Sequence, residues 1–98
     1  MTFEEFERSI REPAPPPGLS DPLLALWWDA RGDWDRAHAH AQAAEDAAGA
    51  LVHAYLHRKE GDLSNAGYWY RRAGQAPAAG PLDLEWAAIA AGLLRAEG

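Results

Sequence analysis

A chain of 98 residues with a net charge of −6 and no cysteine fits one domain and is too short for two independent cores. The absence of cysteine excludes disulfides, thiolate metal sites and a thiol nucleophile. The acidic balance argues against a nucleic-acid or anionic-membrane surface, which needs clustered Lys and Arg. The chain also starts without the basic and apolar regions of a signal peptide and has no run of about 18 apolar residues. We therefore expect a cytoplasmic protein with neither a nucleic-acid nor a membrane partner.

A short amphipathic helix is predicted over residues 3–11, where Thr2 provides the N-cap and apolar residues recur at helical spacing. A proline-rich stretch follows it. Three consecutive prolines favour an extended polyproline II conformation. Residues 12–19 are therefore predicted to be a stiff connector, and residues 1–20 together form an N-terminal helix with its connector.

Glycine and aspartate divide the central region, residues 21–77, into four predicted helices. Pro22 lies in the first turn of the first helix, and Gly32 and Gly61 each end a helix just before an aspartate that starts the next. Gly49 is predicted to separate the second of these helices from the third. The predicted ranges are 21–31, 33–46, 50–60 and 62–73.

A last helix is predicted over residues 82–95, after a loop rich in Gly and Pro. Apolar residues recur along one stripe of it, and residues 78–98 are expected to cap the central helices. The chain shows no alternating β pattern. The first candidates for large core side chains are the five tryptophans, Trp27, Trp28, Trp34, Trp69 and Trp86.

The central region repeats itself with a period of 29 residues. A small residue in mid-helix allows two helices to approach closely, and a Gly-Asp pair makes a tight turn and caps the next helix. Each period therefore predicts one helical hairpin, and two hairpins must stack to bury their apolar faces. The equivalent pairs are Ala25 with Ala54, Gly32 with Gly61, Asp33 with Asp62, Ala37 with Ala66, and Ala44 with Ala73.

These residues resemble the tetratricopeptide repeat over about residues 21–77, and residues 66–73 also resemble the end of a Sel1-type repeat. The period is shorter than the 34 residues usual for the tetratricopeptide family. The longer run HxxxHRxEGDxxNAxYWYRRA, residues 53–73, is similar to a group of small bacterial proteins, a resemblance that implies no activity. The repeat resemblance implies an all-α fold, with two tandem hairpins between an N-terminal and a C-terminal helix, and a scaffold for a protein or peptide partner.

Two histidines could carry metal or ligand chemistry. His53 and His57 are four residues apart on one predicted helix, so they share a face and can bind one metal ion through two imidazoles. Ala54 stands where a zinc protease of the HEXXH type has its catalytic Glu, so that chemistry is not expected. The structural alternative is that both histidines are hydrogen-bonded residues of the core.

Two further histidines lie on the preceding predicted helix. His38 and His40 are two residues apart, so their rings point about 200° apart and cannot both face one site. One of them can join His53 and His57 if the hairpins pack closely. The alternative is that both lie at the surface or at the boundary of the core.

The segment around Tyr68 combines aromatic side chains with Arg71 and Arg72, a mixture enriched in interface hot spots. Helical spacing leaves Tyr68, Arg71 and Arg72 near the surface. Arg58 and Arg72 could form a pair that binds a carboxylate ligand. Alternatively, these arginines pair within the protein, and the candidate acids are Glu60, Asp62 and Asp83.

No pattern of catalytic residues is evident, and we expect neither an enzyme nor a cofactor. The serines lack a Ser-His-Asp spacing, and helix capping explains the paired acids Asp33 with Asp35 and Glu60 with Asp62. The preferred hypothesis is a non-enzymatic helical-repeat module that binds a protein or peptide and forms a homodimer. The alternative is a small ligand- or metal-binding protein built on His53 and His57, with Arg58, Tyr68 and Arg72 as neighbours.

Overall fold

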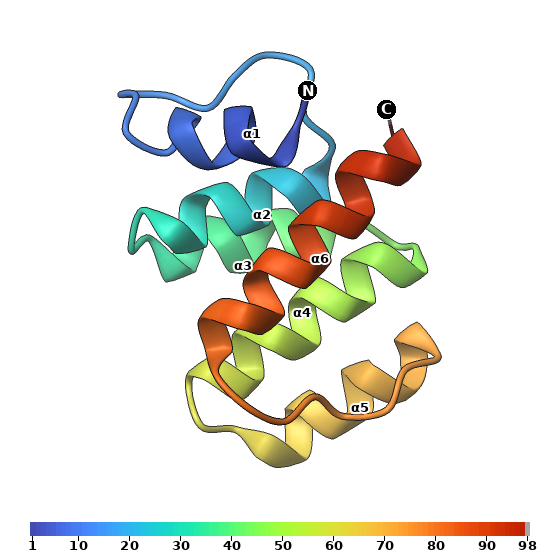
Figure 1. Ribbon diagram of the computed structural model, residues 1–98. Helices are drawn as coiled ribbons and strands as arrows, with labels where there is room; N and C mark the ends of the chain where they lie inside the picture. The colour runs from blue at the N-terminus through green and yellow to red at the C-terminus, as the bar shows by residue number, and fades with distance from the viewer. Residues whose placement is uncertain (98) are drawn as a thin grey trace.

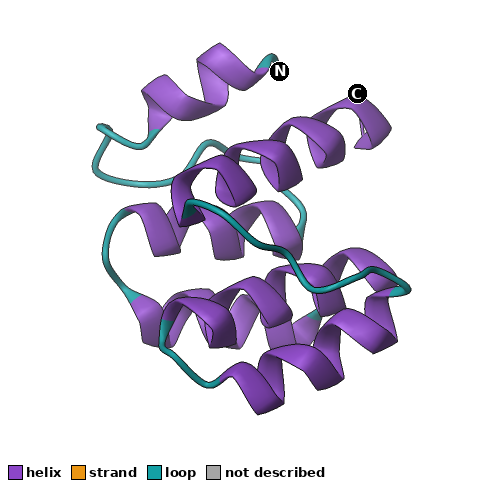
Figure 2. Ribbon diagram, turned by 60° about the horizontal axis from the view of Figure 1, so that its bottom comes forward, coloured by secondary structure: helices purple, strands orange, loops and turns teal. Residues whose placement is uncertain are grey.

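Six α-helices joined by loops make up residues 1–97, the part of the chain that the computed structural model describes (Figure 1). Figure 2 shows no β-strand in these residues, which confirms the predicted all-α class. No helix within residues 1–97 is long and apolar enough to cross a membrane. The helices are α1 (Phe3–Ser9), α2 (Asp21–Ala30), α3 (Trp34–Ala43), α4 (Ala47–Lys59), α5 (Leu63–Ala73) and α6 (Leu82–Glu97).

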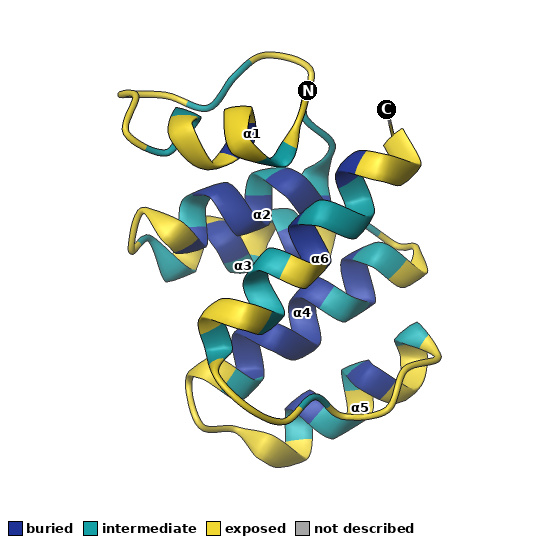
Figure 3. Cartoon of the chain, viewed as in Figure 1, coloured by how far each residue is buried: buried dark blue, intermediate teal, exposed yellow. Residues whose placement is uncertain are grey.

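Helix α4 lies at the centre of the packing. It contacts α2, α3, α5 and α6, while α2 packs against α3 and α6. The buried residues concentrate on α2 and α4, and much of α1 and α5 is exposed (Figure 3). Helix α1 contacts α6, so the two chain ends lie on the same side of the molecule (Figures 1 and 2).

The turns between α2 and α3 and between α4 and α5 have the same local structure. Gly32 and Gly61 adopt φ of 80° and 88°, a left-handed conformation that favours glycine. The side chain of the following residue, Asp33 or Asp62, accepts a hydrogen bond from the backbone N–H three residues further on. The 29-residue period of the sequence therefore corresponds to a repeated helix–turn–helix geometry.

Small side chains of the repeat lie where the paired helices meet. Ala25, Ala37, Ala54 and Ala66 are all at most 2% exposed. An alanine at such a position lets the neighbouring backbone approach closely. The burial of these four residues is consistent with the predicted role of the small residues, whereas the fifth pair, Ala44 and Ala73, is only half-buried.

The predicted boundary between the second and third central helices is wrong. Helix α3 ends at Ala43 and α4 already begins at Ala47, with Gly49 inside its first turn. The Asp46 side chain accepts a hydrogen bond of 2.8 Å from the Gly49 N–H and so caps α4. A Cβ atom at Gly49 would lie 2.2 Å from the carbonyl oxygen of Ala44. This glycine permits a close backbone approach; it does not break a helix.

Of the five tryptophans, only Trp27 is fully buried, at 0% exposed. The other four are half-buried and pack against the edges of the hydrophobic core. Trp86 stacks on Phe6, with ring centroids 5.8 Å apart, and donates a hydrogen bond of 3.0 Å to the carbonyl of Leu26. The tryptophans thus join α1 and α6 to the central helices as well as filling the core.

A buried carboxylate links α2 to α4. Asp29 is 5% exposed, and it accepts hydrogen bonds of 2.8 Å from the Tyr55 hydroxyl and from Lys59 Nζ. Burial and the adjacent Asp29 carboxylate raise the pKa of Tyr55, so its hydroxyl keeps the proton that it donates. Within residues 1–97 every buried side-chain nitrogen and oxygen has a hydrogen-bond partner.

Candidate metal centre

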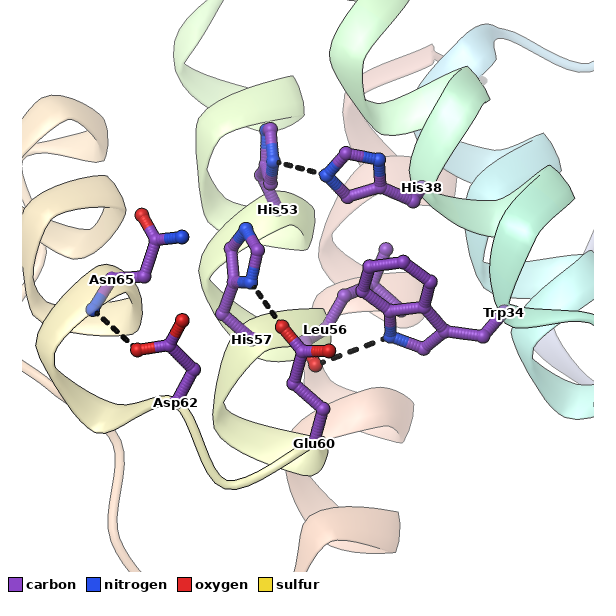
Figure 4. A network of polar contacts seen from close by, with 8 residues as sticks. All are labelled: Trp34, His38, His53, Leu56, His57, Glu60, Asp62 and Asn65. Atoms are coloured by element: carbon purple, nitrogen blue, oxygen red, sulfur yellow. Dashed lines mark hydrogen bonds and ion pairs between the residues drawn. The ribbon is translucent and has the colours of Figure 1, made fainter.

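Three histidines from two helices meet on one side of α4 (Figure 4). His38 of α3 and His53 of α4 are joined through their Nε2 atoms, 2.9 Å apart. His57, one turn after His53, offers a third ring nitrogen, and the three potential ligand atoms lie within 4.8 Å of one another. His38 is thus the histidine that joins the predicted pair, while His40 bonds instead to Asp21 at 2.9 Å.

The local structure explains why these rings converge. Residues four apart on a helix lie on the same face, so His53 and His57 project together towards α3, which packs against α4. Their rings are stacked with centroids 4.9 Å apart. Both histidines are buried, at 4% and 6% exposed, and His38 is half-buried.

Two tryptophans hold the imidazoles in place. Trp34 stacks on His38 with ring centroids 4.7 Å apart and an interplanar angle of 13°. Trp69 of α5 stacks on His53 at 3.9 Å and 14°. Trp34 also donates a hydrogen bond of 3.5 Å to the carbonyl of Leu56 on α4. The cluster therefore lies between two indole rings, which limit the rotation of the imidazoles.

A carboxylate orients the third imidazole. Glu60 Oε1 lies 2.6 Å from His57 Nδ1. Figure 4 shows the other nitrogen of the His57 ring directed towards His53 and His38. Metal-bound histidines commonly donate their outer N–H to a carboxylate, which fixes the tautomer and raises the basicity of the ligating nitrogen.

The electrostatic environment of His53 and His38 favours their neutral forms. Burial, assisted by the neighbouring imidazoles of His38 and His57, lowers the pKa of His53 to about 4. Burial is also the main cause that lowers the pKa of His38. A metal ion binds the neutral imidazole, so protons compete little for the nitrogens of His53 and His38 near pH 7.

A second group of possible ligands is formed by His57, Glu60 and Asp62, and it is largely exposed. The Glu60 carboxylate is already bonded to His57. Asp62 accepts a hydrogen bond of 3.2 Å from the backbone N–H of Asn65 and caps α5. Capping explains Asp62, as expected, so we assign Glu60 to the orientation of His57 and Asp62 to the helix.

The predicted site residues Arg58 and Arg72 make their hydrogen bonds outside the histidine cluster. Arg58 bonds to Glu85 of α6 at 2.8 Å and to the Gly80 carbonyl, so it is paired internally, with an acid other than those predicted. Arg72 donates a hydrogen bond of 3.0 Å to the Tyr68 hydroxyl. Tyr68, Arg71 and Arg72 are exposed, as their spacing predicts. Arg58 and Arg72 thus have separate partners and form no anion-binding pair.

The sequence predicts Glu60 as a helix-capping acid or a partner of an arginine, whereas in the structure it bonds to His57. Its spacing of three from His57 places the two side chains on one helical face, which is the signal that could have identified the contact. Comparisons with protein-family models, with curated proteins and with solved structures find no match to this chain.

Proposed function

We propose that the protein binds one divalent transition-metal ion through His38, His53 and His57. The observation that carries this proposal is the convergence of three ring nitrogens, from two helices, within 4.8 Å of one another. The three imidazoles share one space, and a carboxylate orients one of them from its outer side. That combination supports metal binding over packing alone.

The donor set favours Zn²⁺ or another late first-row divalent ion. Imidazole nitrogen suits zinc, copper, nickel and iron, whereas Mg²⁺ and Ca²⁺ prefer oxygen. Bonds of about 2.0–2.1 Å in a tetrahedral site separate two nitrogens by about 3.3 Å. The Nε2 atoms of His38 and His53 are 2.9 Å apart, a few tenths of an ångström closer than two nitrogens of such a site.

Thermal unfolding of the chelator-stripped protein, titrated with Zn²⁺, tests the proposal. We expect Tm to rise as Zn²⁺ is added and to continue rising with the logarithm of the free Zn²⁺ concentration beyond one equivalent, because a ligand that binds only the folded state stabilises it. His38→Asn should bind Zn²⁺ much more weakly than the parent protein. His40→Asn is the matched control, since His40 lies on the same helix but bonds to Asp21. Equal Zn²⁺ affinities for the two variants would contradict the proposal.

A second candidate function is protein or peptide binding, which the outer side of α5 favours. Leu63 and Tyr68 are 69% and 44% exposed there, and the Arg72 guanidinium lies over the rings of Tyr68 and Trp69. The repeated Gly-Asp turn supports the assignment of α2–α5 to two tetratricopeptide-like hairpins, an architecture that presents binding surfaces. The expected partner is a peptide or a second copy of the chain, bound without catalysis.

Light scattering over a range of protein concentrations tests self-association. A dimer should become weaker when Tyr68→Ser is introduced, because an aromatic side chain at an interface contributes much of its affinity. Leu84→Ser is the control, since Leu84 is 64% exposed but lies on α6. A monomeric mass at every concentration would contradict the dimer.

A further inference from the structure

The histidine cluster supplies three donors and leaves one position of a tetrahedral site without a protein ligand. Within residues 1–97, no fourth His, Asp or Glu joins His38, His53 and His57 at ligand distance. Glu60 has its carboxylate on the outer nitrogen of His57. Structural zinc sites have four protein ligands, whereas three protein ligands leave a position for water or substrate.

The charges at the site favour an anion in that position. Three neutral imidazoles leave the two positive charges of the metal ion uncompensated, and Glu60 contributes one negative charge next to His57. Burial of His53 and His57 limits screening by solvent. A fourth ligand with one negative charge would therefore balance the remaining charge of the site.

A cleft of about 350 Å³ reaches His53, whereas His38 and His57 do not line it. Its walls include His53, Trp69 and Arg72, together with the acidic residues Glu45 and Asp46. The Asp46 carboxylate is engaged with the backbone N–H of Gly49. The Arg72 guanidinium is the cationic group of the wall, and it lies 5.3 Å from the centre of the Trp69 ring that stacks on His53.

We propose that a metal ion held by His38, His53 and His57 keeps an exchangeable fourth position, which takes hydroxide or a small monovalent anion entering past Arg72. This inference rests on the proposed metal binding and adds the class of ligand. The site then resembles in its coordination a centre that activates or binds a small molecule rather than one that only holds the fold together.

Titration of the Co²⁺-loaded protein with azide tests the inference. Co²⁺ binds the same nitrogen donors as Zn²⁺, and its visible absorption is much stronger in four-coordinate than in six-coordinate geometry. We expect an intense visible band at one equivalent of Co²⁺, followed by a saturable spectral change when azide replaces the fourth ligand. Co²⁺ binding at one equivalent with a spectrum insensitive to azide would overturn the exchangeable position and leave metal binding intact. Failure to bind Co²⁺ or Zn²⁺ would overturn both.

Two arginine variants test the route of entry. Arg72→Ala should weaken azide binding several-fold without changing the affinity for Co²⁺, because it removes the cation from the cleft and leaves the imidazoles in place. Arg71→Ala is the matched control, since Arg71 neighbours Arg72 but does not line the cleft. Equal azide affinities for the two variants would overturn the role of Arg72.

Discussion

At the scale of single residues, Glu60 is the side chain that orients one imidazole of the candidate centre, that of His57. Its side chain is 37% exposed, yet its carboxylate lies 2.6 Å from Nδ1 of a buried imidazole, that of His57. A proton held on Nδ1 by this carboxylate leaves the lone pair on Nε2, the nitrogen that faces His38 and His53. The charge of Glu60 therefore acts on the cluster through His57.

Replacement of Glu60 by Gln is expected to weaken Zn²⁺ binding by about 10–100-fold, the range typical for loss of an outer carboxylate partner. Glutamine keeps a hydrogen-bond acceptor near His57, so the loss reports mainly on the charge. Isothermal titration calorimetry measures the affinity. Glu7→Gln removes the same charge from α1 and should leave the affinity unchanged; an equal loss in both variants would count against a specific role for Glu60.

The pKa of His53 predicts how the stability of the metal-free protein depends on pH. In the folded state this pKa is about 4, and in the unfolded chain it is about 6.5. Between these values the unfolded chain binds more protons, so the free energy of unfolding falls as pH decreases. From pH 7 to pH 5 we expect a loss of about 1–2 kcal/mol from this residue.

Urea denaturation at a series of pH values checks this expectation. His53→Gln removes the titrating group while keeping a polar side chain, so its stability should fall less steeply between pH 6.5 and pH 4. The same slope in the parent protein and the variant would show that other groups cause the pH dependence.

At the scale of the helices, we expect the glycine with a left-handed backbone conformation between α4 and α5 to contribute to the free energy of unfolding. Gly61 has a φ of 88°, whereas Gly67 is a helical residue of α5 whose Cβ would meet only the end of the Arg71 side chain, at 3.6 Å. Gly61→Ala should therefore lower the free energy of unfolding by about 1–2 kcal/mol. Gly67→Ala should raise it by about 0.5–1 kcal/mol. Chemical denaturation measures both, and the same sign for the two changes would contradict this account of the turn.

The contact between α2 and α4 yields a second prediction at this scale. Tyr55→Phe removes the hydroxyl that donates to the buried Asp29 carboxylate, and we expect a loss of about 1–3 kcal/mol because a buried acceptor loses its partner. Tyr68→Phe removes an exposed hydroxyl that accepts from Arg72 and should cost much less. Chemical denaturation compares the two variants, and equal losses would argue against a structural role for the Tyr55–Asp29 bond.

For the whole molecule, local sequence signals predict the helices well. Gly32 and Gly61 each precede an aspartate that caps the next helix, and this pattern determines both boundaries from neighbouring residues alone. Apart from the α3–α4 boundary, the helix limits agree with prediction to within two residues. That boundary was missed because Gly49 was interpreted as a helix breaker, although the cap that Asp46 provides is as local as those of Asp33 and Asp62.

The candidate site is only partly predictable, because its contacts join different helices. The spacing of His53 and His57 on one helix predicts a shared face, but the choice of His38 over His40 depends on how α3 rotates against α4. The partner of Arg58 is Glu85, 27 residues away on α6. Such contacts follow from the packing of whole helices, which the spacing of residues within a helix does not determine.

A crystal structure of the protein grown with one equivalent of Zn²⁺, with an anomalous difference map at the zinc edge, tests the central claim most directly. We expect one anomalous peak at about 2.0–2.1 Å from the Nε2 atoms of His38, His53 and His57, with a non-protein fourth ligand. A map in which the hydrogen bond between His38 and His53 persists and zinc lies elsewhere would contradict it.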